Sequence, residues 1–167
     1  MRPTLRSTST RTFVALPVIV LGEQAISRRR LHPQWLPVMA WGFAQYKLAG
    51  GYRLPRAGGP PGMSQGIPGT LVDSGVYAWT RNPMYLGHMV FAAGLALVTR
   101  SPIAVAAAVS LPPWFQRRVK RDERRLAERF GEHYVEYTTR VPRWVPGTRP
   151  MPAETVDSEA GCCRRAG

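Results

Sequence analysis

The fold is decided by residues 82–116, NPMYLGHMVFAAGLALVTRSPIAVAAAVSLPPWFQ, in which Arg100 is the only residue with a formal charge. This arginine divides the segment into two apolar stretches, which begin with Asn82-Pro83 and Ser101-Pro102. A capping residue followed by a proline at the first helical position is typical of a helix start. Because only three residues, 99–101, join the two stretches, we expect a tight helical hairpin.

Two further apolar stretches lie nearer the N-terminus, at residues 12–27 and 33–46. With 82–99 and 101–116 they measure 16, 14, 18 and 16 residues. A helix that crosses a bilayer needs ~20 residues, within a range of about 17–25, so length supports only the third as a span. The small apolar residues of the hairpin favour close helix packing in lipid. We expect an all-α, integral-membrane bundle of about four helices, and whether the first stretch crosses fully stays open.

The chain is strongly basic, with a formal net charge of +13. Such an excess indicates a polyanionic partner, either nucleic acid or the anionic face of a membrane. The sequence has no helix-turn-helix or zinc-knuckle pattern, and a nucleic-acid-binding protein would have no use for four nearly uncharged stretches. We therefore favour the membrane and expect no nucleic-acid partner.

Basic residues are densest directly after the hairpin, where an amphipathic helix is expected to continue to about Phe130. They are Arg117, Arg118, Lys120, Arg121, Arg124, Arg125 and Arg129. Cytoplasmic segments of membrane proteins carry such an excess, so this helix and the loop at 49–80 are expected on the cytoplasmic side. Against a simple four-span topology, the arginines at 28–30 would then face outward.

Residues 1–146 are expected to form a single domain. Its loop at residues 49–69 is rich in glycine and proline, and it is long enough to be functional. The polar residues 147–167 are expected to be a disordered tail. Its adjacent thiols, Cys162 and Cys163, form neither a structural bridge nor a metal site, and we expect no metal.

Asp122 lies on an otherwise apolar face of the predicted basic helix, where it fills the missing turn of a stripe made by Phe115, Val119, Leu126 and Phe130. A carboxylate buried without a partner is very costly. Arg118 lies one turn earlier on the same face. Two interpretations stay open: an intrahelical ion pair and nothing more, or part of a ligand site.

Four motifs follow one another along the C-terminal half: SGVY at 74–77, RNPMYLG at 81–87, DE at 122–123 and FGEHYVEYTTRVP at 130–142. In this order and spacing, residues 69–146 resemble the superfamily of isoprenylcysteine carboxyl methyltransferases and phospholipid methyltransferases, which are integral-membrane enzymes. Several motifs in the right order are far more specific than any one of them. The chain departs from the pattern at Asn82, where the family usually has histidine, and at Asp122, where it has glutamate.

The resemblance implies a pocket for S-adenosylmethionine at the cytoplasmic mouth of the bundle. The positions that correspond to cofactor contacts are Thr70, Leu71, Val72, Tyr77, Asn82, Pro83, Met84, Tyr85 and Asp122. Arg118 corresponds to an arginine on the acceptor side. Asparagine still donates and accepts hydrogen bonds but cannot act as a general base. If the acceptor must lose a proton, Glu123 is the candidate base.

Simpler interpretations of these residues also stay open. Asn82 suits a helix cap without any ligand, and Tyr77 and Tyr85 suit the aromatic belt of a membrane interface. His88, one turn into an apolar helix, is expected to be packed or to line a cavity rather than to bind a ligand.

The expected function is methyl transfer from S-adenosylmethionine to a lipophilic or membrane-delivered acceptor, a carboxylate by preference, with an amine or a thiol left open. The alternatives are a non-catalytic basic membrane protein and a nicotinamide-dependent membrane reductase. We would expect such a reductase to have more membrane spans than this chain offers. A composition rich in Ala, Arg, Gly and Pro favours a multi-pass protein of the bacterial inner membrane, with its active site facing the cytoplasm. The acceptor and the oligomeric state stay open.

Overall fold

The computed structural model describes residues 7–58, 68–145 and 147, in which all regular structure is helical. The elements in order are α1 (Thr8–Thr10), η1 (Arg11–Ala15), α2 (Leu16–Ser27), η2 (Pro33–Trp35), α3 (Leu36–Arg53), η4 (Gly75–Ala78), α4 (Pro83–Thr99), α5 (Pro102–Phe130) and α6 (Glu132–Arg140). The all-α prediction is therefore confirmed for this part of the chain. The middle of the glycine-rich loop and the tail with its two cysteines lie outside the described residues.

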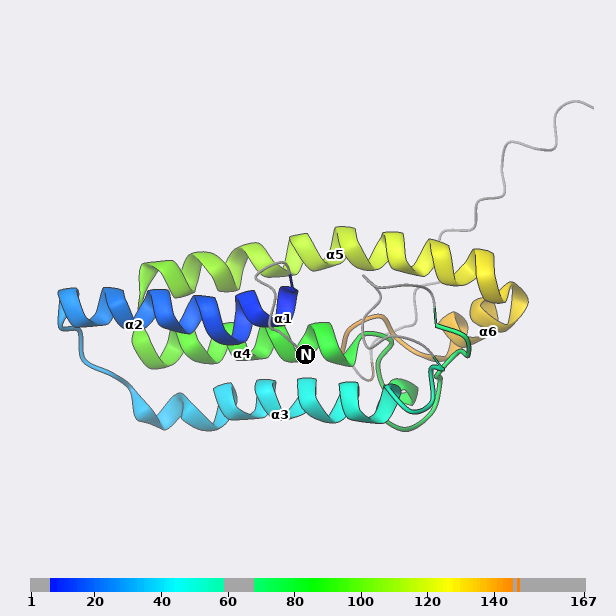
Figure 1. Ribbon diagram of the computed structural model, residues 1–167, viewed down its shortest axis with the longest axis horizontal. Helices are drawn as coiled ribbons and strands as arrows, with labels where there is room; N and C mark the ends of the chain where they lie inside the picture. Colours follow the sequence, from blue (N-terminus) through cyan, green and yellow to red (C-terminus); the bar gives the residue numbers. More distant parts are fainter. Residues whose placement is uncertain (1–6, 59–67, 146, 148–167) are drawn as a thin grey trace, which may run out of the picture.

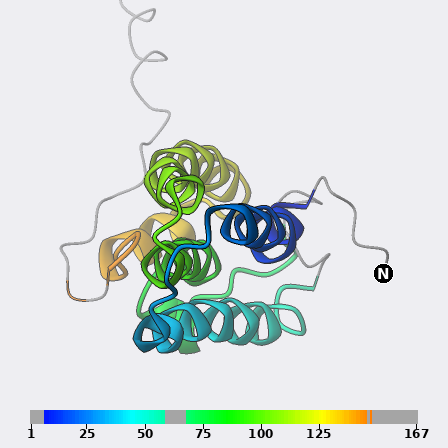
Figure 2. The ribbon, with the colours of Figure 1, turned by 90° about the vertical axis from the view of Figure 1, so that its left-hand side faces the viewer.

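The four longer helices α2 to α5 lie side by side along one axis (Figure 1). Seen end-on, α4 lies at the centre, with α2, α3 and α5 around it (Figure 2). The short helix α6 packs beneath the far end of α5, away from the tip of the hairpin. This arrangement leaves the N-terminal end of α4 facing the second half of α5 and α6.

Glycines let α4 lie against α3 at unusually short range. A Cβ atom added to Gly87 would lie 2.8 Å from the Gly42 carbonyl oxygen, and one added to Gly94 would lie 2.5 Å from the Met39 nitrogen. Only a residue without a side chain fits such a backbone approach. The small residues of the predicted hairpin do promote close packing, but the two glycines face α3 rather than the hairpin partner α5.

The helical hairpin predicted at 82–116 is present. Helix α4 ends at Thr99, Arg100 adopts a left-handed conformation with φ of 48°, and α5 starts at Pro102. The Ser101 hydroxyl accepts a hydrogen bond from the Ala104 nitrogen at 3.2 Å, so the predicted cap of α5 is confirmed. The predicted cap of α4 is wrong, because the Asn82 side chain makes no capping hydrogen bond.

The fourth apolar stretch and the basic segment after it form one continuous helix, α5, of 29 residues. The sequence suggested a boundary near Gln116. Instead, the helix passes through Pro112 and Pro113, which lack the N–H groups that would bond the carbonyls four residues earlier. It stops at Gly131, whose φ is 54°, as the sequence predicted.

Two apolar cores hold these elements. The first lies in the bundle and contains Val20, Phe91, Leu95, Ala96 and Ala104. The second lies under α6 and contains Tyr134, Tyr137 and Val141, with Leu71, Leu126, Ala127 and Phe130 packed against it. The second core fixes α6 and the segment before η4 at the end of α5.

None of the helices in the described ranges has both the length and the apolar character required to cross a membrane.

Candidate functional site

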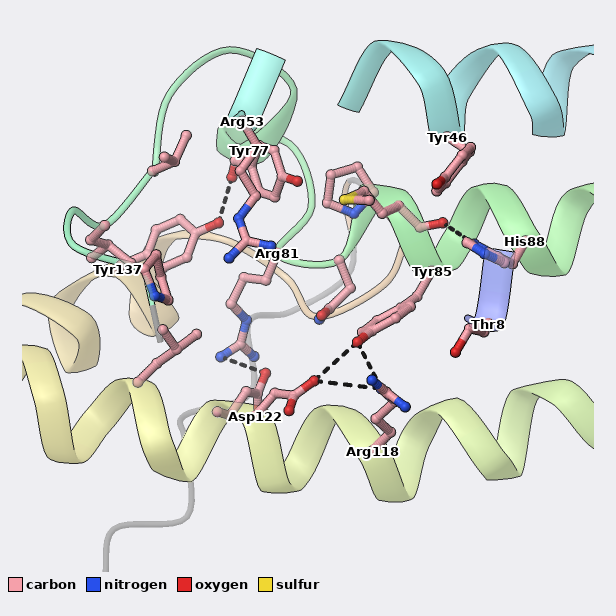
Figure 3. A pocket seen from close by; sticks show the side chains of 18 of the residues that line it. Thr8, Tyr46, Arg53, Tyr77, Arg81, Tyr85, His88, Arg118, Asp122 and Tyr137 are labelled. Atoms are coloured by element: carbon pink, nitrogen blue, oxygen red, sulfur yellow. Dashed lines mark hydrogen bonds and ion pairs between the residues drawn. The ribbon is translucent and has the colours of Figure 1, made fainter. Parts of the chain in front are cut away.

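A cavity of about 340 Å³ lies where the N-terminal end of α4 faces α5 and α6 (Figure 3). All eleven residues that the sequence singled out line it: Thr70, Leu71, Val72, Tyr77, Asn82, Pro83, Met84, Tyr85, Arg118, Asp122 and Glu123. They come from the loop before η4, from η4, from the start of α4 and from α5. The fold thus brings together segments that are about fifty residues apart in the sequence.

Tyr85, Arg118 and Asp122 form a hydrogen-bonded group between α4 and α5. The Tyr85 hydroxyl donates to Asp122 Oδ2 at 3.0 Å and accepts from Arg118 Nε at 3.0 Å. Arg118 Nε lies 4.0 Å from Asp122 Oδ2. Asp122 is 8% exposed, so the buried carboxylate has the partners that it needs. The predicted pair of Arg118 and Asp122 within α5 is present. Tyr85 of α4 bridges the two side chains, and an ion pair with no further role would not require this bridge.

Glu123 points to a different set of partners. Arg143 Nε donates to both carboxylate oxygens at 3.1 Å and Arg143 Nη2 donates to Oε2 at 2.6 Å, while Arg81 Nη1 lies 3.3 Å from Oε1. All three side chains are buried. To take a proton, this carboxylate would have to weaken buried interactions with two guanidinium groups, which is costly. The geometry therefore favours Glu123 as an anchor of the cavity wall over Glu123 as a base.

The segment before α4 is tied to the end of the described chain. The Arg81 nitrogen donates to the Pro142 carbonyl at 3.0 Å, and Asn82 Nδ2 donates to the Arg143 carbonyl at 3.1 Å. The Thr80 hydroxyl donates to the same carbonyl at 3.3 Å. The Asn82 side chain thus contacts the end of the described chain and makes no capping hydrogen bond to α4. This contact holds the Arg143 backbone in place, so that its guanidinium reaches Glu123.

Tyr77 is part of the cavity wall rather than of an exposed aromatic belt, since it is only 7% exposed. Its hydroxyl donates to the Ala49 carbonyl at 3.5 Å, and its own carbonyl accepts from the Tyr137 hydroxyl at 2.7 Å. Burial raises the pKa of Tyr77 to about 12, although the nearby Arg53 lowers it. The phenol is therefore protonated at neutral pH and acts as a hydrogen-bond donor.

The turn before Tyr77 requires glycine. Gly75 has a φ of 59°, and a Cβ atom there would lie within 2.7 Å of the Tyr52 hydroxyl. The Tyr52 and Ser74 hydroxyls are hydrogen-bonded at 3.0 Å. The SGVY motif thus places its tyrosine in the cavity by a tight turn against the end of α3.

His88 lines the cavity, as one of the two interpretations from sequence expected. Its Nδ1 lies 2.8 Å from the Met84 carbonyl oxygen, which can only accept, so we assign the proton to Nδ1. The ring is buried among the aromatic rings of Phe13, Tyr46 and Phe115. Within the described residues, Nε2 has no hydrogen-bond partner, so it is available to accept a hydrogen bond from a ligand in the cavity.

Several lining residues were missed from the sequence. Arg81 is the first residue of the RNPMYLG motif, and the need to pair a buried Glu123 could have pointed to it. Tyr46 and Arg53 come from α3, where no pattern marked them. The other missed residues are Ser7, Thr8, Ser9, Pro68, Leu126, Tyr134 and Tyr137.

The positive charge around the cavity exceeds the negative. Arg53, Arg81 and Arg118 line it, against Asp122 and Glu123. Aromatic rings and methylene groups make up much of the remaining wall. Pockets for small organic ligands typically have about 300–1,000 Å³ and a mostly apolar lining with a few placed polar groups. The cavity has the size and lining of such a pocket. Its carboxylates can bind a cation, its arginines an anion and its tyrosines an aromatic ring.

Comparison with known proteins finds methyltransferases that are similar to part of the chain. Residues 59–133 match the model of the phospholipid methyltransferase family. Protein-S-isoprenylcysteine O-methyltransferase of Homo sapiens is 41% identical over 78 residues, which are 46% of this chain and 28% of that protein. Protein-S-isoprenylcysteine O-methyltransferase B of Arabidopsis thaliana is 40% identical over 77 residues, 46% of this chain and 39% of that protein.

The Saccharomyces cerevisiae enzyme of the same name is 35% identical over 77 residues, 46% of this chain and 32% of that protein. The matched segments thus span well under half of each relative's length. No solved structure gives a significant match. The matched segment carries the SGVY, RNPMYLG and DE motifs that line the cavity, and over this segment the chain is similar to isoprenylcysteine carboxyl methyltransferases and phospholipid methyltransferases.

Proposed function

We propose that the chain is a methyltransferase that uses S-adenosylmethionine to methylate a lipophilic, membrane-delivered acceptor, with a carboxylate as the methylated group. The observation that carries this proposal is the cavity, which collects every residue that the family resemblance assigned to the cofactor and to the acceptor. The resemblance rests on sequence and the cavity on the fold. Their coincidence is what supports the function.

The residues present fit S-adenosylmethionine. When bound, this cofactor supplies a methyl group on a sulfonium cation. We assign Asp122 and Asn82 to its polar groups, and Tyr77 and Tyr85 to its ring and cation, since aromatic faces attract both. Thr70, Leu71, Val72, Pro83 and Met84 complete the proposed cofactor wall.

Arg118 is the residue that we assign to the acceptor. Its Nε is used by the Tyr85 hydroxyl, so the two Nη groups are the donors for a carboxylate, which a guanidinium can bind at two oxygens. Trp114 lies beside it, with the Arg118 Cζ 5.5 Å from the ring centroid. Tyr85 thus connects Arg118, which we assign to the acceptor, to Asp122, which we assign to the cofactor. This group would hold the acceptor and the methyl donor in place for an in-line displacement.

The contacts of Glu123 support a carboxylate as the acceptor. An amine or a thiol must lose a proton during methylation. Glu123, the candidate base from the sequence, is already paired with Arg81 and Arg143. A carboxylate acceptor is already anionic and needs no base, so alignment and charge placement suffice. The geometry therefore supports a carboxylate over an amine or a thiol.

Membrane residence is supported by a girdle of exposed, large apolar side chains over η1, α2, α3 and the first half of α5. It includes Val14, Val18, Ile19, Leu21, Ile26, Leu36, Trp41, Phe43, Leu48, Ile103, Val105, Val109 and Trp114. Apolar surfaces this extensive mark contact with a membrane or another protein. We propose that the girdle lies in lipid of a bacterial inner membrane, and that the basic half of α5 places the cavity at the cytoplasmic face.

Titration calorimetry of the detergent-solubilised chain with S-adenosylmethionine tests the proposed function. We expect one saturable site per chain, and transfer of radiolabelled methyl to a prenylated cysteine carboxylate. Saturable binding of a reduced nicotinamide dinucleotide instead would favour the reductase. Absence of binding to either would leave a non-catalytic membrane protein. In a separate test of location, the chain should stay in the membrane pellet after an alkaline carbonate wash, and recovery in the supernatant would contradict the proposal.

A further inference from the structure

A second hollow, of about 450 Å³, lies between the N-terminal helical segment and the middle of α5. It is lined by Thr8, Arg11, Thr12, Ser110, Leu111, Pro113, Trp114 and Arg117, and we call it the lateral groove. Only Thr8 also lines the cavity described above. Of the other seven residues, Trp114 also lies beside Arg118, and the proposed methyl transfer gives no role to the remaining six.

The backbone is irregular on both sides of the groove. Residues Arg11–Ala15 form a π-helical turn, in which the Leu16 nitrogen bonds the Arg11 carbonyl. Opposite, α5 contains Pro112 and Pro113, which interrupt its hydrogen-bond ladder. Single π-turns within helices occur frequently at functional sites. The N-terminal segment and the middle of α5 lie next to each other in the fold (Figure 1), so the two irregular turns face the same hollow.

The lining has the chemistry of an anion site with an apolar floor. Arg11 and Arg117 supply two positive charges, and none of the eight lining residues is acidic. Thr8 and Thr12 add hydroxyl groups, the Ser110 hydroxyl donates to the Ala107 carbonyl, and Leu111, Pro113 and Trp114 supply apolar surface. Guanidinium groups bind the oxygens of a phosphate with strong, geometrically specific hydrogen bonds. A phosphate joined to an apolar body matches this lining better than a free anion does.

The groove also lies at the level where apolar surface gives way to basic surface. Along α5, the exposed side chains of Val105 and Val109 precede the groove, and the basic run that starts at Arg117 follows it. The N-terminal segment runs in the opposite direction (Figure 1). There, Arg11 lies at the groove and the exposed Val14 and Val18 follow it. Both helices thus place an arginine at the same boundary.

We propose that the lateral groove binds one phospholipid with an anionic headgroup, distinct from the methyl acceptor. Its phosphodiester lies against Arg11 and Arg117, and its acyl chains follow the apolar surface of Val109 and Val18. This proposal goes beyond the methyl transfer and does not depend on it. It gives a ligand to the groove that the reaction leaves unused.

Native mass spectrometry of the full chain in mild detergent tests this proposal, with phosphatidylglycerol and phosphatidylcholine as the two probes. We expect wild type to retain one phosphatidylglycerol in preference to phosphatidylcholine. Near an anionic membrane surface each arginine contributes enough to affinity that the double substitution Arg11→Gln and Arg117→Gln should weaken phosphatidylglycerol binding by roughly 30-fold. Arg117→Gln alone changes only an exposed side chain and should weaken it by about fivefold.

The matched control is Arg121→Gln with Arg124→Gln, which removes the same charge from exposed positions of α5 outside the groove. The control should keep its lipid affinity within about threefold of wild type, because it leaves the groove arginines in place. An equal loss in both double variants would show a diffuse charge effect and overturn the proposal. Equal retention of both lipids would also overturn it, as would displacement of the lipid by millimolar inorganic phosphate. Titration with S-adenosylmethionine on the same samples shows that the variants are folded, and it tests the methyltransferase separately.

Discussion

Replacing Asp122 with asparagine removes one negative charge from the cavity while keeping the shape of the side chain. In the folded protein, Asp122 Oδ2 accepts a hydrogen bond from Tyr85 and lies 4.0 Å from Arg118 Nε. The asparagine oxygen can still accept from Tyr85. What is lost is the charge that offsets Arg118 and that would strengthen hydrogen bonds to the cofactor.

The size of the effect follows from the burial of this carboxylate. Hydrogen bonds to charged groups contribute about 1.5–3 kcal/mol, and each 1.4 kcal/mol is a factor of ten in affinity. We therefore expect Asp122→Asn to weaken S-adenosylmethionine binding by about one to two decades. Arg118 would at the same time lose its counter-charge, so the acceptor arginine becomes more mobile and turnover falls further than occupancy of the cofactor site explains.

The assay is titration calorimetry of the solubilised chain, with Asp73→Asn as the control. Asp73→Asn is the same change of side chain at a position that does not line the cavity. The ion pair of Asp73 with Arg140, at 3.9 Å, is solvent-exposed. Exposed pairs contribute roughly 0–1 kcal/mol, so this variant should bind the cofactor as wild type does. Equal affinities for wild type and Asp122→Asn would reduce Asp122 and Arg118 to a structural ion pair, and the assignment of the cofactor site would fall with it.

Three further predictions test other parts of the structure. Arg118→Ala should abolish methyl transfer and change cofactor affinity by less than about tenfold. Arg121→Ala, an exposed control on α5, should retain activity. Full activity of Arg118→Ala would refute the acceptor role. Gly87→Ala should lower the unfolding free energy by about 1–3 kcal/mol, because its Cβ would meet the backbone of α3. The helical Gly51, with open space around it, should tolerate alanine, and similar melting temperatures for both variants would contradict the packing. Burial raises the pKa of Tyr77 and of the two tyrosines of the second core, so their contribution to stability should be complete below pH ~10, the unfolded pKa, and should decline as the pH rises from there towards and beyond 12. Ultraviolet absorbance of tyrosinate during an alkaline titration measures this, and ionisation of all six tyrosines near pH 10 before any unfolding would oppose it. The tyrosines concerned are Tyr77, Tyr134 and Tyr137.

Local patterns in the sequence predicted the helical hairpin and, with the family resemblance, eleven of the residues that line the cavity. The proline-marked starts and the short link at 99–101 predicted the hairpin, because capping and chain reach act over a few residues. The apolar stripe on α5 predicted that Asp122 is buried, because helical periodicity fixes which side chains share a face. The family resemblance over residues 69–146 then named eleven residues, seven of them within the SGVY, RNPMYLG and DE motifs. The fold places all eleven around one cavity.

The partners of those residues were decided by tertiary structure. The sequence marked Glu123 as a candidate base, and the structure adds its ion pairs with Arg81 and Arg143. The sequence marked Asn82 as a helix cap, and the structure shows that its amide donates to the Arg143 carbonyl and that it makes no capping hydrogen bond. These contacts join segments 20 to 61 residues apart. No local preference encodes them, since they exist only after α6 has packed and returned the chain to the start of α4. The sequence determines which side chains are available at the cavity, and long-range packing decides which of them are already bound and which are left for a ligand.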